Sequence, residues 1–192
     1  MNKVSKWANL IIPISSAIFA LTALITVCIT ISSWNTQREA ARPYLTLKDS
    51  PLIRLEDDIN FEFIFNNVGI HPAFNMSSKT IVFDESLNVE PVHIDEYAIA
   101  NDIPGNTPTS LLINMKPQEY RPNILTFKPY YIVIALHYSD PVLNKKYDQI
   151  IYLKWSGISG GTAGSIFHVK VTEKNNIMKY LNDWHIEPKP SG

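Results

Sequence analysis

Ser159 has the surroundings closest to a chemical motif, because glycines flank it in the stretch Gly157-Ile158-Ser159-Gly160-Gly161. A serine nucleophile needs a histidine as base and a carboxylate that orients this histidine. His71, Asp102 and Ser159 follow one another along the chain in a known order of such triads. These three residues are therefore the candidate triad of a hydrolase.

The surrounding residues favour a simpler interpretation of this loop. In chymotrypsin-like proteases an acidic residue precedes the nucleophilic serine, whereas Ile158 stands at that position here. Residues 157–164 hold four of the seven glycines of the chain, which is typical of a flexible connection between strands. No lysine follows Gly164, so the pattern of a P-loop is also missing. We keep Ser159 as a candidate interaction residue, and a membrane-tethered hydrolase as the alternative function.

Metal, cofactor and nucleic-acid chemistry have little basis in the composition. The five histidines, at positions 71, 93, 137, 168 and 185, show no spacing typical of metal ligands. A single cysteine excludes an internal disulfide and every multi-cysteine metal site. The 17 basic and 18 acidic side chains give a net charge of −1, which provides no attraction for nucleic acid. We expect no metal, no cofactor and no nucleic-acid partner.

An uncharged segment near the N-terminus predicts a membrane anchor. Residues 7–37 contain no charged side chain. The apolar core, residues 10–31, would make a helix of about 33 Å, which matches a hydrocarbon layer of roughly 30 Å. Trp7 and Trp34 lie at its two ends, as in an aromatic belt. We predict an N-terminal tail over 1–9, a transmembrane helix over 10–34 and a short linker over 35–42.

Two further questions concern this segment. The apolar region of a cleaved signal peptide spans about 7–15 residues, so the length here favours an uncleaved anchor. The flanks are equally basic if the chain amine is free: this amine, Lys3 and Lys6 precede the segment, and Arg38, Arg42 and Lys48 follow it. The positive-inside rule therefore assigns no orientation, and we predict a single-pass protein of the cell membrane with either topology.

The region from 43 to 172 has the pattern of a β-sandwich. Short runs of alternating residues are separated by prolines, ten of which lie between Pro43 and Pro141. Phe61, Phe63 and Phe65 share one face of a strand, and residues 130–138 are apolar on both faces, as in a covered central strand. We predict strands at 44–48, 60–65, 76–83, 111–115, 130–139, 146–156 and 166–172, and a short helical turn over 95–101. The predicted fold is mainly β, an immunoglobulin-like antiparallel sandwich.

The last segment has helical periodicity. Ile177, Met178, Leu181 and Trp184 recur at helical spacing, and Thr172 is a candidate N-cap. We predict an amphipathic helix over 173–186 and a tail over 187–192. This helix either packs on the sandwich or presents Trp184 to a partner.

Two stretches resemble a known group of proteins. Residues 66–75 fit an N-x-G-x-x-P-A-x-N turn between two strands, and residues 130–155 form a hairpin pattern that includes Tyr138-Ser139-Asp140. With the anchor and the following Arg42-Pro43-Tyr44, they resemble bacterial single-pass membrane proteins that have a β-sandwich domain and no assigned activity. Within the turn, the candidate interaction residues are Asn67, Gly69, His71, Pro72 and Asn75.

These observations favour a membrane-anchored module without enzymatic activity. The lipid bilayer would hold the N-terminal helix, and the sandwich would bind a protein partner or serve as an accessory subunit of a membrane complex. The candidate surfaces are the 66–75 turn, the 157–164 loop and the C-terminal helix.

Overall fold

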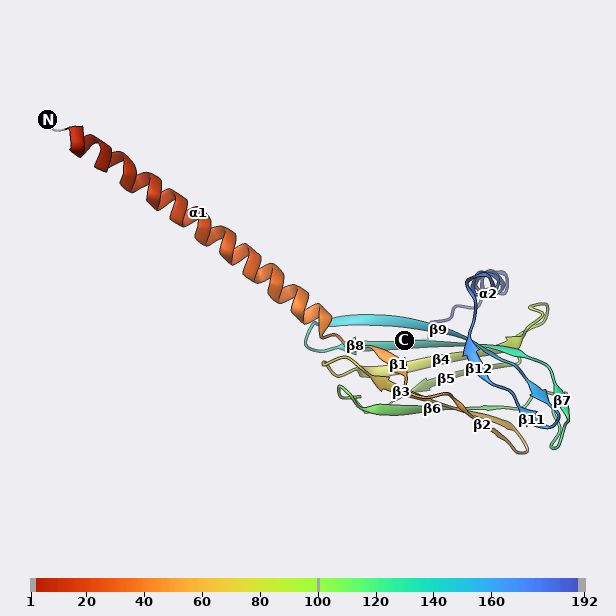
Figure 1. Ribbon diagram of the computed structural model, residues 1–192. Helices are drawn as coiled ribbons and strands as arrows, with labels where there is room; N and C mark the ends of the chain where they lie inside the picture. The colour runs from red at the N-terminus through yellow and green to blue at the C-terminus, as the bar shows by residue number, and fades with distance from the viewer. Residues whose placement is uncertain (1–2, 100, 190–192) are drawn as a thin grey trace. The chain divides into compact units, whose positions relative to one another are not determined.

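The structure is a computed structural model that describes residues 3–99 and 101–189. It divides into two units, residues 1–41 and 42–192 (Figure 1). The first unit is a helix and the second is a β-sandwich with one helix. Each is described by itself.

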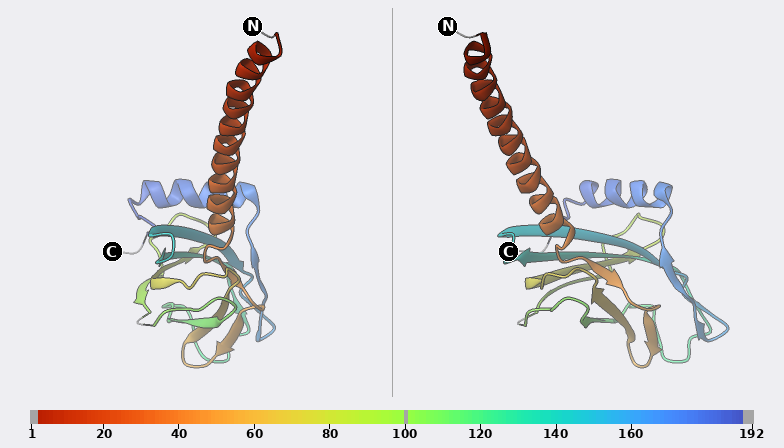
Figure 2. Two further views of the ribbon diagram at one scale, coloured as in Figure 1. Left: turned by 90° about the vertical axis from the view of Figure 1, so that its left-hand side faces the viewer. Right: turned by 60° about the vertical axis from the view of Figure 1, so that its left-hand side comes forward.

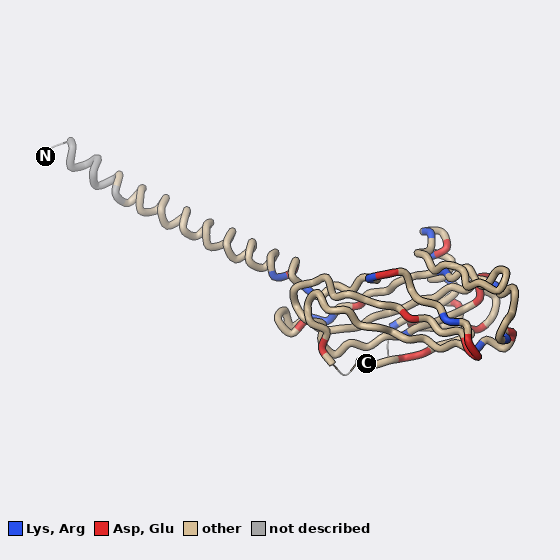
Figure 3. The backbone as a smooth tube through the Cα atoms, turned by 60° about the horizontal axis from the view of Figure 1, so that its bottom comes forward, with Lys and Arg blue, Asp and Glu red and all other residues tan. Residues whose placement is uncertain are grey.

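The first unit is one long helix, α1 (Lys3–Ala40). Its segment Pro13–Ala40 is long and apolar enough to cross a membrane, and no part of the chain that the structure describes buries its most apolar stretch. In the part of the helix that Figure 3 colours, charged residues occur only near the C-terminal end, where the sequence has Arg38 and Glu39. Threonine hydroxyls donate to the carbonyl four residues earlier, as Thr22 does to Ile18 and Thr26 to Thr22, both at 2.9 Å. These bonds satisfy the polar side chains within the helix itself.

The helix is longer than the sequence predicted at both ends. Residues 3–9, predicted as a tail, and 35–40, predicted as a linker, are helical. Residues 35–40 include Gln, Arg, Glu and Ala, which are good helix formers, and contain no glycine or proline. Pro43 disfavours helical geometry in the residue before it, which is consistent with the helix ending at Ala40.

The second unit contains two main antiparallel sheets and a small third one (Figure 1). In the first, β3 (Ile59–Asn67) pairs on one edge with β1 (Leu45–Leu47) and β2 (Leu52–Leu55), and it also pairs with β6 (Pro108–Met115). The second has the order β12 (Ile166–His168), β9 (Lys145–Trp155), β8 (Tyr130–Asp140), β4 (Phe74–Asp84), β5 (His93–Ala98). The third joins β7 (Thr126–Phe127), β10 (Ile158–Ser159) and β11 (Thr162–Ala163).

The main hydrophobic core lies between the two large sheets. Phe61, Phe63 and Phe65 are fully buried there, as their alternation predicted. Trp155 is also fully buried, and its ring meets Phe61 edge-on at 5.2 Å between centroids. Strand β8 is buried on both faces, because its inner face joins this core and its outer face carries a second cluster. The prediction of a central, doubly covered strand is confirmed.

Helix α2 (Val171–Asp183) covers the outer face of the five-stranded sheet (Figure 2). Ile177, Tyr180 and Leu181 are buried against the second cluster, so this helix packs on the sandwich. It begins earlier than predicted, with Lys170 rather than Thr172 at the N-cap, because the Glu173 carboxylate accepts the Lys170 backbone N–H at 2.8 Å. Two residues after the helix ends at Asp183, His185 adopts the left-handed conformation, with φ 53°.

Other differences from the predicted elements concern short or polar strands. The predicted helical turn at 95–101 is wrong, because residues 93–98 form β5 and pair in register with β4. The polar residues of β5 do not by themselves favour a strand, and the pairing with β4 determines the conformation of this segment. The sequence also missed β2, β7, β10 and β11, each of at most four residues. All seven predicted strands are present, with shifted ends.

Candidate functional site

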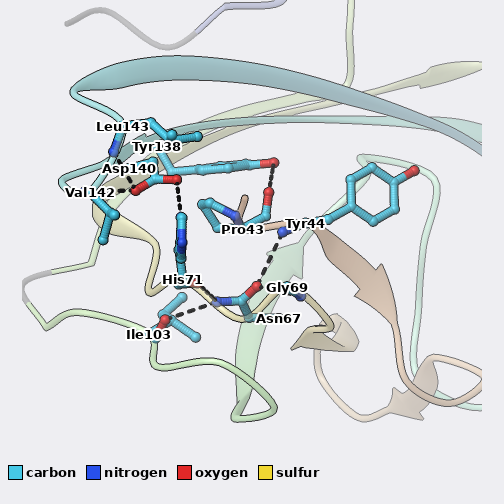
Figure 4. A network of polar contacts seen from close by, with 10 residues as sticks. All are labelled: Pro43, Tyr44, Asn67, Gly69, His71, Ile103, Tyr138, Asp140, Val142 and Leu143. Carbon is cyan, nitrogen blue, oxygen red and sulfur yellow. Dashed lines mark hydrogen bonds and ion pairs between the residues drawn. The ribbon is translucent and has the colours of Figure 1, made fainter. Parts of the chain in front are cut away.

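The turn between β3 and β4 is organised by the side chain of Asn67, which is fully buried (Figure 4). Its amide oxygen accepts the backbone N–H groups of Tyr44 and Gly69, each at 3.1 Å. Its amide nitrogen donates to the carbonyls of His71 at 2.9 Å and Ile103 at 3.2 Å. One side chain therefore joins the start of the domain, the 66–75 turn and the 103–107 loop.

A second buried polar side chain, Asp140, ties the β8–β9 turn to the same place (Figure 4). One carboxylate oxygen accepts the backbone N–H groups of Val142 at 2.8 Å and Leu143 at 3.2 Å. The other lies 2.7 Å from Nδ1 of His71, whose side chain is 13% exposed. An ionised carboxylate only accepts hydrogen bonds, so a bond to it requires the tautomer of His71 that has its proton on Nδ1. The hairpin pattern at 130–155 includes Asp140, but no sequence pattern indicates its pairing with His71.

We call this part of the sandwich the loop end and define it as residues 42–44, 67–73, 103–107 and 140–145. Gly69 is needed there because a Cβ atom would overlap the backbone oxygen of Arg42 and Cα of Pro43. The φ of Gly69 is not positive; the left-handed residue of this turn is Asn75, at φ 48°, where the pairing of β4 with β8 is irregular. Asn75 is exposed and Pro72 is half-buried. Asn67 and Gly69 are thus structural, and His71 is the candidate here that has both a buried partner and some access to solvent.

Ser159 lies at the opposite end of the sandwich. It pairs with Thr126 and Thr162 in the small sheet of β7, β10 and β11, which we call the hairpin end. Phe127 of this sheet stacks on Tyr130, the first residue of β8, at 5.4 Å, whereas Asp140 is the last residue of β8. Ten residue steps of a strand span about 33 Å. His71, Asp102 and Ser159 therefore do not form a triad.

The remaining candidate, Trp184, follows α2 and is 40% exposed. Its ring lies 6.0 Å from that of Tyr180, which is buried and stacks on Phe83 at 4.8 Å. The three predicted surfaces are therefore separate places on the domain. Within the described ranges 3–99 and 101–189, no group of three or more His, Cys, Asp or Glu side chains is placed to hold a metal ion.

A groove that no sequence pattern indicates lies between β1 and β9. It has a volume of about 480 Å³ and is lined by both polar and apolar side chains. The side chain of Gln149 crosses it, donating to the Leu45 carbonyl at 2.5 Å. The remaining lining residues are Tyr44, Thr46, Leu47, Ile150, Ile151, Tyr152, His168, Val169 and Lys174.

The groove borders a strand edge without a neighbouring strand. Strand β12 pairs with β9 only at residues 153–155, and the pairings of the described residues give β9 no other partner on this side. The backbone N–H of Ser156 and the carbonyl of Tyr152 both bond toward the β12 side. Successive residues of a strand alternate in direction, so the backbone groups of Ile150 and Asp148 point to this open edge as well.

Comparison with known proteins identifies a family for this chain. No curated protein matches the chain. The family described as Domain of unknown function (DUF8453) matches residues 7–159, which include most of the apolar helix, the 66–75 turn, the β8–β9 hairpin and Ser159. The chain belongs to this family.

Proposed function

We propose that this chain is a single-pass membrane protein whose β-sandwich binds an extended segment of a partner protein and has no enzymatic activity of its own. The observation that carries the proposal is the open edge of β9 beside the groove at β1. An extended segment that adds to a sheet edge gains backbone hydrogen bonds, and neighbouring pockets select its side chains. The groove offers both features in one place.

The long helix supports the membrane anchor. Its apolar side chains are exposed along the helix, for example Phe19 at 78%, Ile29 at 62% and Leu24 at 61%. Such a surface is unfavourable in water, and the hydrocarbon layer of a bilayer would cover it. The anchor would hold the sandwich at the membrane, where a partner in the same membrane is within reach.

The lining of the groove suits a segment with apolar side chains and at least one acidic group. Tyr44, Leu47 and Ile151 supply apolar surface, while His168 and Lys174 supply the basic side. Lys174 already lies over the Tyr152 ring, 5.1 Å from its centroid, which holds the ammonium group at the groove. A carboxylate of the bound segment would pair with it.

Site-specific photocrosslinking in native membranes tests the proposal. A photoreactive amino acid at Thr46, on the groove, should give one discrete adduct, and the same group at the exposed Asn114 of β6 should give none. Ile150→Pro removes a backbone donor from the open edge without removing a bond to β8, so it should abolish the adduct. Lys174→Glu, which leaves the backbone intact, should weaken it. Equal adducts from Thr46 and Asn114, or an adduct that survives both substitutions, would contradict the proposal.

The alternative, a hydrolase that uses Ser159, would need a base other than His71. His71 pairs with Asp140 at the loop end, and Ser159 lies at the hairpin end. Labelling by a fluorophosphonate that Ser159→Ala abolishes would favour the hydrolase over the binding module.

A further inference from the structure

We propose that the loop end of the sandwich rests on the bilayer surface and inserts the side chains of Val68 and Ile70 among the lipid headgroups. This inference rests on the proposed membrane anchor. It adds a second lipid-binding surface on the domain itself, distinct from the helix. Its ligand is a lipid surface that carries negative charge.

Exposed aliphatic side chains gather at the loop end. Ile70 is 77% exposed and Val68 is 48% exposed, both in the turn after β3, and Val142 in the β8–β9 turn is 46% exposed. The His71–Asp140 pair joins these two turns directly. Large aliphatic side chains exposed on adjoining turns favour contact with a partner or a membrane.

Hydrogen bonds to buried side chains hold the backbone of the turns that carry these aliphatic residues. Asn67 and Asp140 are fully buried and hold the 67–73 and 140–143 backbones through hydrogen bonds. The loops would therefore lose little conformational freedom when they meet a surface. The backbone that carries Val68, Ile70 and Val142 is therefore held in place before it meets a surface.

Chain connectivity brings the loop end close to the membrane, whatever the angle between helix and domain. Helix α1 ends at Ala40 and the second unit begins at Arg42. Ala40 lies six residues after Trp34, about 9 Å along a helix, and the headgroup region on one side is about 5–7 Å thick. The Asn67 side chain bonds Tyr44, so the 66–75 turn lies next to the chain that leaves the helix.

The charge of the loop end suits an anionic surface. Arg42, Lys145 and Lys146 are exposed on and beside the loop end, and Arg42 lies over the Tyr147 ring at 5.4 Å. Asp140 is buried against His71, which leaves Asp102 as the exposed acidic residue in the adjoining loop. Basic side chains near anionic headgroups strengthen binding of a domain to the surface.

A polarity-sensitive probe on the full chain tests this inference. Cys28 is the only cysteine, so Cys28→Ser gives a background for single-cysteine variants. Ile70→Cys and, as the matched control, Ser159→Cys both replace exposed side chains at opposite ends of the sandwich. Each would carry an NBD label in vesicles of phosphatidylcholine with phosphatidylglycerol. We expect a blue shift of emission, and its loss with a lipid-borne quencher, at position 70 and not at 159.

The possible outcomes distinguish a failure of this inference from a failure of the proposed membrane anchor. If alkaline carbonate fails to extract the chain and neither probe shifts, the anchor stands and the lipid-binding loop end is wrong. If both probes shift equally, the contact is not a property of the loop end, and the inference is also wrong. If carbonate releases the chain, the anchor itself has failed.

The double variant Lys145→Glu with Lys146→Glu tests the role of charge. It should reduce the shift at position 70 in the anionic vesicles, and an unchanged shift would contradict the role of charge.

Discussion

The loop end and the hairpin end close the same sandwich with different chemistry. At the hairpin end, the rings of Phe127, Tyr130 and Trp155 lie 5.4–6.3 Å from one another and fill the space between the sheets. At the loop end, the side chains of Asn67 and Asp140 are fully buried and bond the backbones of the adjoining loops. Apolar packing tolerates adjustment, whereas a buried polar group without its partners is costly.

This difference indicates which end of the sandwich depends more strictly on particular side chains. The loop end fixes the conformation of three connections, and exposed apolar side chains lie on these connections. The hairpin end carries the glycine-rich loop and an exposed serine on a small sheet of two-residue strands. The predictions below test this contrast, starting with the largest expected effect.

Asn67→Ala should destabilise the sandwich by at least about 3 kcal/mol, because several buried backbone groups lose their partner at once. Urea unfolding of the full chain in detergent, followed by far-ultraviolet circular dichroism, measures this. Asn114→Ala is the matched control, since Asn114 is exposed and its amide nitrogen donates one hydrogen bond, to Oδ1 of Asn60 at 3.0 Å. Equal unfolding midpoints for the two variants would show that the loop end does not depend on its polar hub.

A pair of glycine substitutions compares the two ends directly. Gly69→Ala should cost about 2–3 kcal/mol, because the new methyl group meets the backbone of Arg42 and Pro43. Gly160→Ala meets no atom within 4 Å, and its φ of +59° should limit the cost to about 1 kcal/mol. Thermal unfolding of both variants checks the order of the effects. A larger loss for Gly160→Ala would reverse the contrast.

The pH dependence of stability offers a third comparison, between two histidines. His71 has a carboxylate partner, whereas Nε2 of His93 is buried without a hydrogen-bond partner. Burial lowers the pKa of His93 below its ordinary value, so the folded state binds fewer protons than the unfolded state. Stability should therefore fall as pH decreases through about 6.5, the ordinary pKa of histidine.

His93→Leu should remove part of this loss, and urea midpoints at pH 7 and pH 5 measure it. The exposed His168 provides the control substitution, His168→Gln, which should leave the pH dependence as it is. If the His93 variant loses as much stability on acidification as the parent chain, burial of this ring is not the cause.

The smallest effect is expected for Ser159→Ala. Ser159 is exposed, and its backbone rather than its side chain pairs with β7 and β11. The free energy of unfolding should change by no more than about 0.5 kcal/mol. Labelling with a fluorophosphonate should not differ between the variant and the parent chain, and a loss of labelling would place chemistry at the hairpin end.

Sequence patterns predicted the parts of the fold that obey a regular period. The alternating phenylalanines of β3 predicted a core strand, and the two apolar faces of β8 predicted a central strand. The apolar N-terminal segment predicted a long apolar helix, and the structure confirms all three. The periodicity of α2 also predicted Ile177 and Leu181 at its packed face. These features depend on side-chain spacing within one element, which a sequence displays.

The site could not be predicted in the same way, because its contacts join residues far apart in the chain. The pairing of His71 with Asp140 spans 69 positions, and the bond from Gln149 to Leu45 spans 104. The turn pattern at 66–75 marked the correct place, but nothing local indicates that Asn67 is buried or that Asp140 faces His71. Strand β5 was missed for a related reason, since its residues become a strand through pairing with β4.

Cys28 allows the most direct test of the membrane anchor, which is the central claim. Cys28 is exposed on α1, so within the described residues its thiol is open to reagents. In native membranes the full chain should resist a membrane-impermeant maleimide at Cys28 until sodium dodecyl sulfate is added, because lipid covers this part of the helix. A cysteine at position 159 in the Cys28→Ser background should react at once in opened membranes. Equally rapid labelling of Cys28 in opened membranes before the detergent is added would contradict the anchor.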